Sequence, residues 1–333
     1  MKKILCLLIC ILFTVSGCGK KNDEKVIDKF SKDLDNASSY YLKASMDISS
    51  DEDTFNYDVE VSYMKDDYYK VYLMNNINNH EQVILKNDDG VYVITPSLNK
   101  SFKFQSDWPH SSSQSYLLNS ILEDIKNDEE IVYTEEENYY IYECEVDYPN
   151  NVELKYQKVY FDKDKNIKMV KVYNSEDIVK INVEFKEVNY KPSIKADDFK
   201  IENNIDEDCC TVKEETTGAL EDIIYPLYVP ADTYLKSKET IATDNGERVI
   251  LTFAGGKNFV LVEETSKVNE EFEIIPVYGE PLMLSNTVGA LSANSLSWSF
   301  DNVDYYLTSS DLSNQEMLTV AHSLNVTDMV VGK

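Results

Sequence analysis

Apolar residues recur at every second position through several long stretches of this sequence, and this period constrains the fold more than any other feature. It runs through residues 42–48, 55–63, 69–73 and 179–185, and through a hairpin over residues 83–94 with the turn Asp88-Asp89-Gly90. Such a pattern predicts β-strands that each have one apolar and one polar side. We therefore predict an antiparallel sheet with one wet face and one apolar face that other elements must cover.

Two helical segments can provide that cover. A first helix is indicated by four apolar residues at helical spacing, namely Val26, Ile27, Phe30 and Leu34. A second has a wider apolar stripe made of Tyr116, Leu117, Leu118, Ile121, Leu122 and Ile125. Three serines at 111–113 precede it and suit a helix start. A curved sheet with this helix on its concave side encloses either a packed core or an apolar cavity, and the sequence leaves both open.

The composition changes near residue 205. Gly90 is the one glycine between residues 20 and 217, whereas seven glycines follow from residue 218 onward. Residues 205–217 between these parts are acidic and show no strand alternation. We predict a first domain over residues 25–204, an acidic linker over 205–217 and a second domain over 218–333.

The second part of the chain predicts a smaller β-rich α+β domain. Two hairpins are expected, one over residues 247–264 around Gly255-Gly256 and one over 295–308. Ser313 and Glu316 form a capping box for a last helix, which has Met317, Val320, Ala321 and Leu324 on one face. This order resembles a small extracytoplasmic domain of uncharacterised function found in Gram-positive lipoproteins and anti-sigma factors.

The first eighteen residues predict where the protein is located. Lys2 and Lys3 precede an apolar stretch at 4–15, which would rise only about 18 Å as a helix, against about 30 Å for a bilayer core. Val15-Ser16-Gly17-Cys18 resembles the lipobox of bacterial lipoproteins. The resemblance implies a signal peptide over 1–17, a diacylglycerol on Cys18, a tether over 18–24 and a position on the outer face of the cell membrane. The alternative is an ordinary secretory signal with an accidental cysteine.

Charge excludes one class of partner. The chain has 60 acidic against 32 basic residues, a formal net charge of −28, and Arg248 is its single arginine. Such a surface repels phosphate backbones, so we expect no nucleic-acid binding.

No motif predicts an enzyme, a metal or a cofactor. The run at 162–166 begins like a calcium loop, but Ile167 and Tyr173 stand where that loop needs glycine and glutamate, so we interpret it as a hairpin turn. Gly255-Gly256-Lys257 lacks the rest of a phosphate loop. We interpret His110 as a loop residue and His322 as a packing residue.

The three cysteines that would remain in the mature chain are Cys144, Cys209 and Cys210. An odd number favours free thiols, and a disulfide between molecules or from Cys144 to one of the other two is the alternative.

A block in the first domain carries a family resemblance. It consists of Val91-Tyr92-Val93-Ile94-Thr95-Pro96, Lys100-Ser101-Phe102-Lys103-Phe104, Trp108-Pro109 and Ser113-Gln114-Ser115-Tyr116-Leu117-Leu118. The block is similar to the LolA/RseB lipoprotein-carrier superfamily, and most to its lipid-anchored Gram-positive branch, typified by YdcC and GerS. The similarity covers residues 25–200. It implies a curved half-barrel closed by helices over an apolar interior, with Phe102, Phe104, Trp108 and the second helix as the candidate groove or lid.

These observations favour a non-enzymatic binding or regulatory lipoprotein of a sporulating Gram-positive bacterium. The resemblance implies a protein partner, either a cell-wall or cortex-modifying enzyme or a signalling protein. A homodimer and a hydrophobic ligand stay open. The alternative function is LolA-like binding or transport of lipid or lipoprotein acyl chains.

Overall fold

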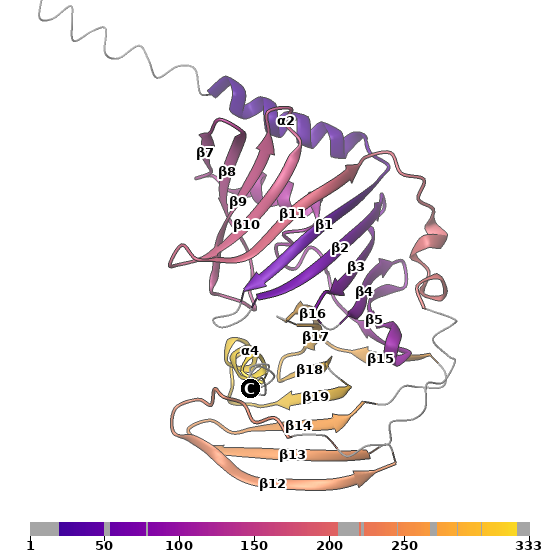
Figure 1. Cartoon of the computed structure of the whole chain (residues 1–333), viewed down its shortest axis with the longest axis vertical. Helices are drawn as coiled ribbons and strands as arrows, with labels where there is room; N and C mark the ends of the chain where they lie inside the picture. The colour runs from indigo at the N-terminus through magenta and orange to yellow at the C-terminus, as the bar shows by residue number, and fades with distance from the viewer. Residues whose placement is uncertain are drawn as a thin grey trace, which may run out of the picture.

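The computed structural model describes residues 20–49, 54–77, 79–205, 220, 223–244, 246–266, 272–284, 286–300 and 302–324. The described strands form two sheets, one of twelve strands and one of seven, and three α-helices accompany them (Figure 1). The mainly β class with added helices is therefore as the sequence predicts. The signal segment, Cys18, residues 206–217 with Cys209 and Cys210, and the end of the chain lie outside the described residues.

The larger sheet is a long, curved meander. Its order is β15-β6-β5-β4-β3-β2-β1-β11-β10-β9-β8-β7. The strands are β1 (Ser39–Ser49), β2 (Thr54–Met64), β3 (Tyr68–Asn75), β4 (His80–Asn87), β5 (Gly90–Thr95), β6 (Lys100–Phe104), β7 (Val132–Glu135), β8 (Tyr139–Glu145), β9 (Leu154–Asp162), β10 (Ile167–Asn174), β11 (Val179–Asn189) and β15 (Glu273–Val277). All neighbours are antiparallel except β15, which comes from the C-terminal part and pairs in parallel with β6. The two parts of the chain therefore share one sheet.

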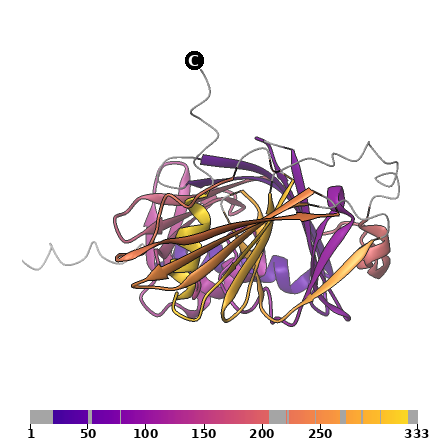
Figure 2. The same cartoon turned by 90° about the horizontal axis from the view of Figure 1, so that it is seen from below.

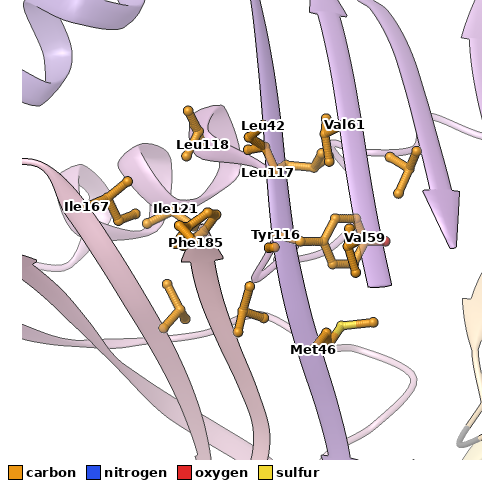
Figure 3. Close-up of a cluster of buried hydrophobic side chains, with 14 of the residues drawn as sticks. Leu42, Met46, Val59, Val61, Tyr116, Leu117, Leu118, Ile121, Ile167 and Phe185 are labelled. Atoms are coloured by element: carbon orange, nitrogen blue, oxygen red, sulfur yellow. The ribbon is translucent and has the colours of Figure 1, made fainter. Parts of the chain in front are cut away.

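Two helices cover the apolar inner face of this sheet. They are α2 (Lys20–Asn36) and α3 (Leu118–Asn127). Figure 3 shows side chains of and just before α3 beside Leu42 of β1, Ile167 of β10 and Phe185 of β11. Phe30 of α2 packs edge-on against Phe161, with ring centroids 5.3 Å apart. Period-two strands and an amphipathic helix thus bury their apolar sides against each other, as predicted.

The starts of both helices differ from expectation. The predicted tether at 18–24 is helical from Lys20 onward, because no glycine or proline interrupts the polar run after Gly19. The serines at 111–113 do not cap α3, whose N-cap position is Leu117. Ser113 lies too far upstream and instead donates a hydrogen bond from Oγ to Asp124 within the helix, at 2.8 Å.

Part of the outer face is also covered. The short helices η2 (Ala196–Phe199) and η3 (Ile201–Asn203) lie over β4 and β5, where Phe199 is buried against Val83, Leu85, Tyr92 and Ile94. A third short helix, η1 (Pro96–Leu98), links β5 to β6. The run at 162–166 is the β9–β10 turn, as interpreted from the sequence: Asp162 Oδ1 accepts from the Asn166 N–H at 2.9 Å.

The smaller sheet has the order β12-β13-β14-β19-β18-β17-β16. Its strands are β12 (Thr233–Thr243), β13 (Gly246–Gly255), β14 (Phe259–Thr265), β16 (Glu280–Met283), β17 (Val288–Leu291), β18 (Ser295–Phe300) and β19 (Val303–Thr308). Both predicted hairpins are present, as β13–β14 and β18–β19. Gly255 has φ +123°, and a Cβ there would lie 2.2 Å from the Asp232 carbonyl oxygen, so the turn requires glycine.

The last helix, α4 (Asn314–His322), closes the core of the smaller sheet. Ser313 and Glu316 form the predicted capping box, and Met317, Val320, Ala321 and Leu324 are buried with Trp298. Figure 2, seen from below, shows this sheet lying across the end of the larger one, while β15 reaches out to its edge.

Candidate functional site: an apolar cavity between the two sheets

A partly open cavity of about 480 Å³ lies where the two sheets meet. The larger sheet contributes apolar side chains from the inner face of four strands, namely Met46, Ile48, Ile84, Leu154 and Ile181. The C-terminal part contributes Leu282, Met283, Leu284, Val288 and Leu318. This volume falls within the range of about 300–1,000 Å³ that is usual for small-ligand sites. The cavity can therefore hold one apolar chain or a small apolar molecule.

Direct contacts between the two parts of the chain fix the cavity walls. Gln82 of β4 is buried and accepts a hydrogen bond at Oε1 from the Val288 N–H, at 2.6 Å. Asn75 Nδ2 donates to the Asn286 carbonyl at 3.3 Å. Lys100 of β6 forms an ion pair of 3.1 Å with Asp304 of β19. Because buried polar groups are costly to leave unpaired, the bonds of Gln82 and Asn75 hold β17 and the turn before it against the end of the larger sheet. The ion pair of Lys100 adds a contact to β19.

One face of α4 forms part of the cavity wall. Gln315, Leu318, Thr319, His322 and Ser323 line the cavity, at spacings of three and four that place them on one side of the helix. The opposite side packs into the core of the smaller sheet. Only the core side was predicted from the sequence. The second stripe, at the same helical spacing, was the available signal for the cavity side.

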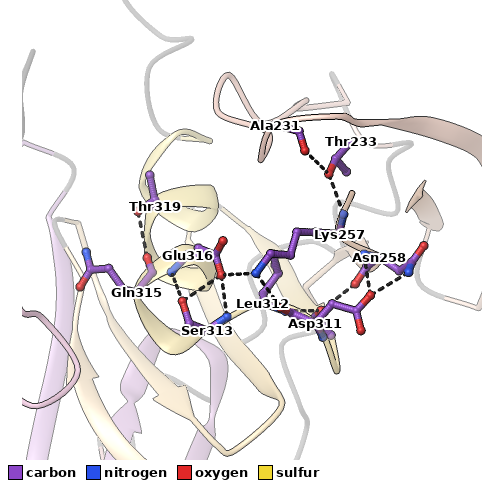
Figure 4. Close-up of polar contacts among 11 residues, drawn as sticks. Ala231, Thr233, Lys257, Asn258, Asp311, Leu312, Ser313, Gln315, Glu316 and Thr319 are labelled. Atoms are coloured by element: carbon purple, nitrogen blue, oxygen red, sulfur yellow. Dashed lines mark hydrogen bonds and ion pairs between the residues drawn. The ribbon is translucent and has the colours of Figure 1, made fainter. Parts of the chain in front are cut away.

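A group of polar contacts orients α4 (Figure 4). Lys257 Nζ contacts Glu316 Oε2 at 3.1 Å, and Glu316 also accepts from the Ser313 N–H at 2.9 Å. These contacts hold the pKa of Glu316 below its usual value. Asp311 accepts from the Asn258 N–H at 3.0 Å and from its side-chain amide at 2.7 Å. The β13–β14 turn thereby fixes the start of α4.

The cavity takes in only two of the predicted groove residues. Tyr116 and Trp108 line it, and both are buried. The other members of the second helix pack in the core instead and do not line the cavity; they are Leu117, Leu118, Ile121, Leu122 and Ile125. Phe104 is buried in the same core, and Phe102 is partly buried beside it with ring centroids 6.5 Å apart. Under α3 the interior is therefore packed, and the space lies at the end of the sheet.

A half-buried carboxyl, Asp124, lies on α3 outside the cavity lining. Asp124 of α3 accepts from Ser113 Oγ and from Gln157 Nε2, each at 2.8 Å. Burial raises its pKa to about 7 despite these two donors. Burial also raises the pKa of the Cys144 thiol to about 12, and this cysteine is free. A thiol that stays protonated is a poor nucleophile, which fits the expectation of a free structural cysteine.

The described residues contain no group of three or more His, Cys, Asp or Glu side chains arranged to hold a metal ion. His110 is exposed in a loop, as expected, with Nε2 2.9 Å from Asp67. His322 lies on the cavity side of α4, so the prediction that it only packs was incomplete. Within the same residues, no helix is both long and apolar enough to cross a membrane.

The sequence matches the family described as "Sporulation protein YdcC-like" over residues 1–199. It is also 37% identical over 332 residues to the sporulation protein YdcC of Bacillus subtilis, with 97% of each chain covered. The chain belongs to the YdcC-like sporulation protein family. The YdcC branch inferred from the block between Val91 and Leu118 is thereby confirmed.

Two solved structures that match this YdcC-like chain do so with low sequence identity and low TM-scores. The complex of MucA and MucB from Pseudomonas aeruginosa matches at 11% identity and a TM-score of 0.32, covering 90% of this chain and 98% of that one. The complex of the CwlD amidase and the GerS lipoprotein from Clostridioides difficile matches at 16% identity and a TM-score of 0.25, covering 50% and 95%.

Proposed function

We propose that this chain is a sporulation-related, non-enzymatic binding protein that is tethered outside the cell membrane by a lipid on Cys18. Membership of the YdcC-like family supports the sporulation context. The lipobox-like Val15-Ser16-Gly17-Cys18 supports the anchor.

The observation that carries binding is the apolar cavity of about 480 Å³ at the junction of the sheets. Its ligand in this proposal is one apolar chain, such as the acyl chain of a lipid or of a lipid-modified protein. Each methylene that leaves water contributes about 0.8 kcal/mol, so affinity for a dispersed ligand should rise with the length of its chain.

A protein partner is the second candidate, and the rim of the cavity favours it. Leu227 and Tyr228 line the cavity and are 64% and 38% exposed, and Val152 nearby is 54% exposed. Exposed apolar side chains around an apolar opening are typical of a surface that a partner covers. In this proposal a partner binds the rim, and its affinity depends on whether the cavity holds a ligand.

Dye binding and mass spectrometry test the first proposal. The chain from Lys20 onward, which keeps every described helix and strand, is titrated with an uncharged naphthylamine dye that fluoresces in apolar sites. We expect saturable binding, and lipid extracted from the natively purified protein. Ile181→Trp places a large ring in the cavity and should abolish binding. The matched control is Ile241→Trp on β12, where the side chain is 45% exposed and remote from the cavity. Equal dye binding by both variants would place the site elsewhere.

A further inference from the structure

The hydroxyl groups on the cavity side of α4 have a defined hydrogen-bond polarity. Thr319 Oγ1 donates to the Gln315 carbonyl at 2.9 Å (Figure 4), and Ser323 Oγ donates to the Val320 carbonyl at 2.7 Å. A hydroxyl has one proton and two lone pairs. With their protons used inside the helix, both oxygens can only accept a hydrogen bond from a ligand.

Tyr116, which lines the cavity from the segment before α3, also has a hydroxyl that can only accept a hydrogen bond from a ligand. The Tyr116 hydroxyl donates to Gln114 Oε1 at 2.9 Å, so its oxygen also remains an acceptor. Burial raises the pKa of Tyr116 well above its ordinary value, so the phenol keeps its proton. The side-chain amide of Gln315 adds N–H groups, but these are uncharged; its Oε1 accepts from the Val152 N–H at 3.2 Å.

Electrostatics disfavours an anion at the same place. α4 runs from Asn314 to His322, and its C-terminal residues line the cavity. The C-terminal end of a helix carries a partial negative charge, which repels carboxylates and phosphates. The lining residues include one carboxylate, Glu153, and one ammonium group, Lys180, so these two side chains give the lining no net charge. A cation would also lose its hydration there, because Glu153, the one carboxylate among the lining residues, is exposed rather than buried beside the hydroxyls.

We infer that the ligand is an uncharged amphiphile with hydrogen-bond donors, such as the hydroxyls of a monoacylglycerol, and neither a fatty-acid anion nor a phospholipid. Its polar end lies against Thr319 and Ser323, and its chain lies along the apolar walls. This inference deepens the proposed function and rests on it.

Four competitors with one myristoyl-length chain test the inference by displacing the naphthylamine dye at pH 8: a monoacylglycerol, the fatty-acid anion, a lysophosphatidylglycerol and the primary alkylamine. We expect the monoacylglycerol to bind about tenfold more tightly than the others. It can form one or two hydrogen bonds with Thr319 and Ser323 that the others lack or could form only by burying a charge, and this number of bonds corresponds to about a tenfold ratio of dissociation constants. Thr319→Val and Ser323→Ala should each weaken binding of the monoacylglycerol about threefold relative to binding of the dye by the same variant. Thr319→Lys supplies a cationic donor and should shift the preference to the fatty-acid anion.

The control variant is Thr240→Val, on the exposed strand β12 and outside the cavity lining, which should change none of these affinities. Tighter binding of the anion, the lysophospholipid or the amine than of the monoacylglycerol would overturn this inference, while the proposed apolar site would stand. Failure of the dye to bind, together with absence of extractable lipid from the natively purified protein, would instead defeat the proposed function, and the inference with it.

Discussion

The side-chain amide of Gln82 pairs with the backbone of Val288 as a neighbouring strand residue would. Gln82 Oε1 accepts from the Val288 N–H at 2.6 Å, and Gln82 Nε2 donates to the Val288 carbonyl at 3.3 Å. Thr287 Oγ1 also donates to Gln82 Oε1, at 3.1 Å. All three residues are buried, so these bonds link the two parts of the chain away from water.

Replacing Gln82 should therefore loosen this link. Gln82→Met keeps the length of the side chain but leaves the polar groups of Val288 buried without this partner. We expect a loss of about 1–3 kcal/mol in the free energy of unfolding, measured by urea denaturation. Gln105→Met is the control, because Gln105 is exposed and should change stability by no more than about 0.5 kcal/mol. Equal effects of the two substitutions would show that the link adds no stability.

The packed region under α3 and the cavity should respond differently to loss of an isoleucine. Ile121 is fully buried, so Ile121→Ala should cost about 2–5 kcal/mol without changing dye binding. Ile181 lines the cavity and is only partly buried, so Ile181→Ala should cost less and should alter dye affinity. The measurements are urea denaturation and dye titration. Altered dye binding by Ile121→Ala at little cost in stability would show that α3 is a lid.

Stability should fall as the pH rises from about 4 to about 7, because burial raises the pKa of Asp124 from 3.8 to about 7. In this window the unfolded chain has released the Asp124 proton and the folded protein still holds it, so raising the pH favours unfolding. Asp124→Asn cannot ionise and should show a shallower decline in the urea midpoint over this window. Its absolute stability is expected to be lower than that of the wild type in acid. The new amide N–H₂ group and Gln157 Nε2 are both hydrogen-bond donors, so they cannot pair with each other.

Two further variants separate Asp124 from other carboxyls. Burial also raises the pKa of Glu263 to about 7, so Glu263→Gln should remove a second, independent part of the slope. Asp164→Asn, at an exposed turn, should leave the slope unchanged. A wild-type slope that survives both Asp124→Asn and Glu263→Gln would contradict the assignment.

The anchor prediction concerns Cys18, which lies outside the described residues. Lipid transfer to its sulfur would precede cleavage, so Cys18→Ala should accumulate as a precursor that keeps residues 1–17. Intact-mass measurement of the membrane fraction distinguishes this precursor from a processed, acylated chain. Efficient cleavage and release of the alanine variant would indicate an ordinary secretory signal.

Proteolysis tests the predicted linker. We expect a protease to cut within the predicted linker, residues 205–217, because this stretch is acidic and lacks strand alternation. The two fragments should still elute together in native size-exclusion chromatography, since β15 is hydrogen-bonded to β6. They should separate in urea. Absence of cutting at 205–217 would show that the boundary is wrong, and separation without denaturant would show that the shared sheet is weak.

Much of the secondary structure could be predicted because its signals are local. Alternation such as Val59, Val61 and Tyr63 depends on neighbours in sequence, and the Ser313–Glu316 capping box occupies four consecutive positions. β15 has no such signal. Its sequence includes Pro276, which argues against an ordinary strand, and the edge of a sheet tolerates it.

The cavity was only partly predictable, because sequence signals are local and the cavity is formed by residues that lie far apart in the sequence. Trp108 and Tyr116 were candidates through the family resemblance, whereas Val288 and Leu318 meet them only after the two sheets come together. Gln82 lies between Glu81 and Val83 in an ordinary strand pattern. No local property distinguishes an amide that will bond to residues some two hundred positions away, as Gln82 does to Thr287 and Val288.

The parallel pairing of β15 with β6 has a consequence for how the protein is made. β6 ends at Phe104 and β15 begins at Glu273. During synthesis the outer edge of β6 therefore stays unpaired until most of the polypeptide has emerged. Until then this edge presents unpaired N–H and C=O groups, which can recruit strands from other nascent chains. Premature termination before Glu273 would therefore yield a product prone to self-association.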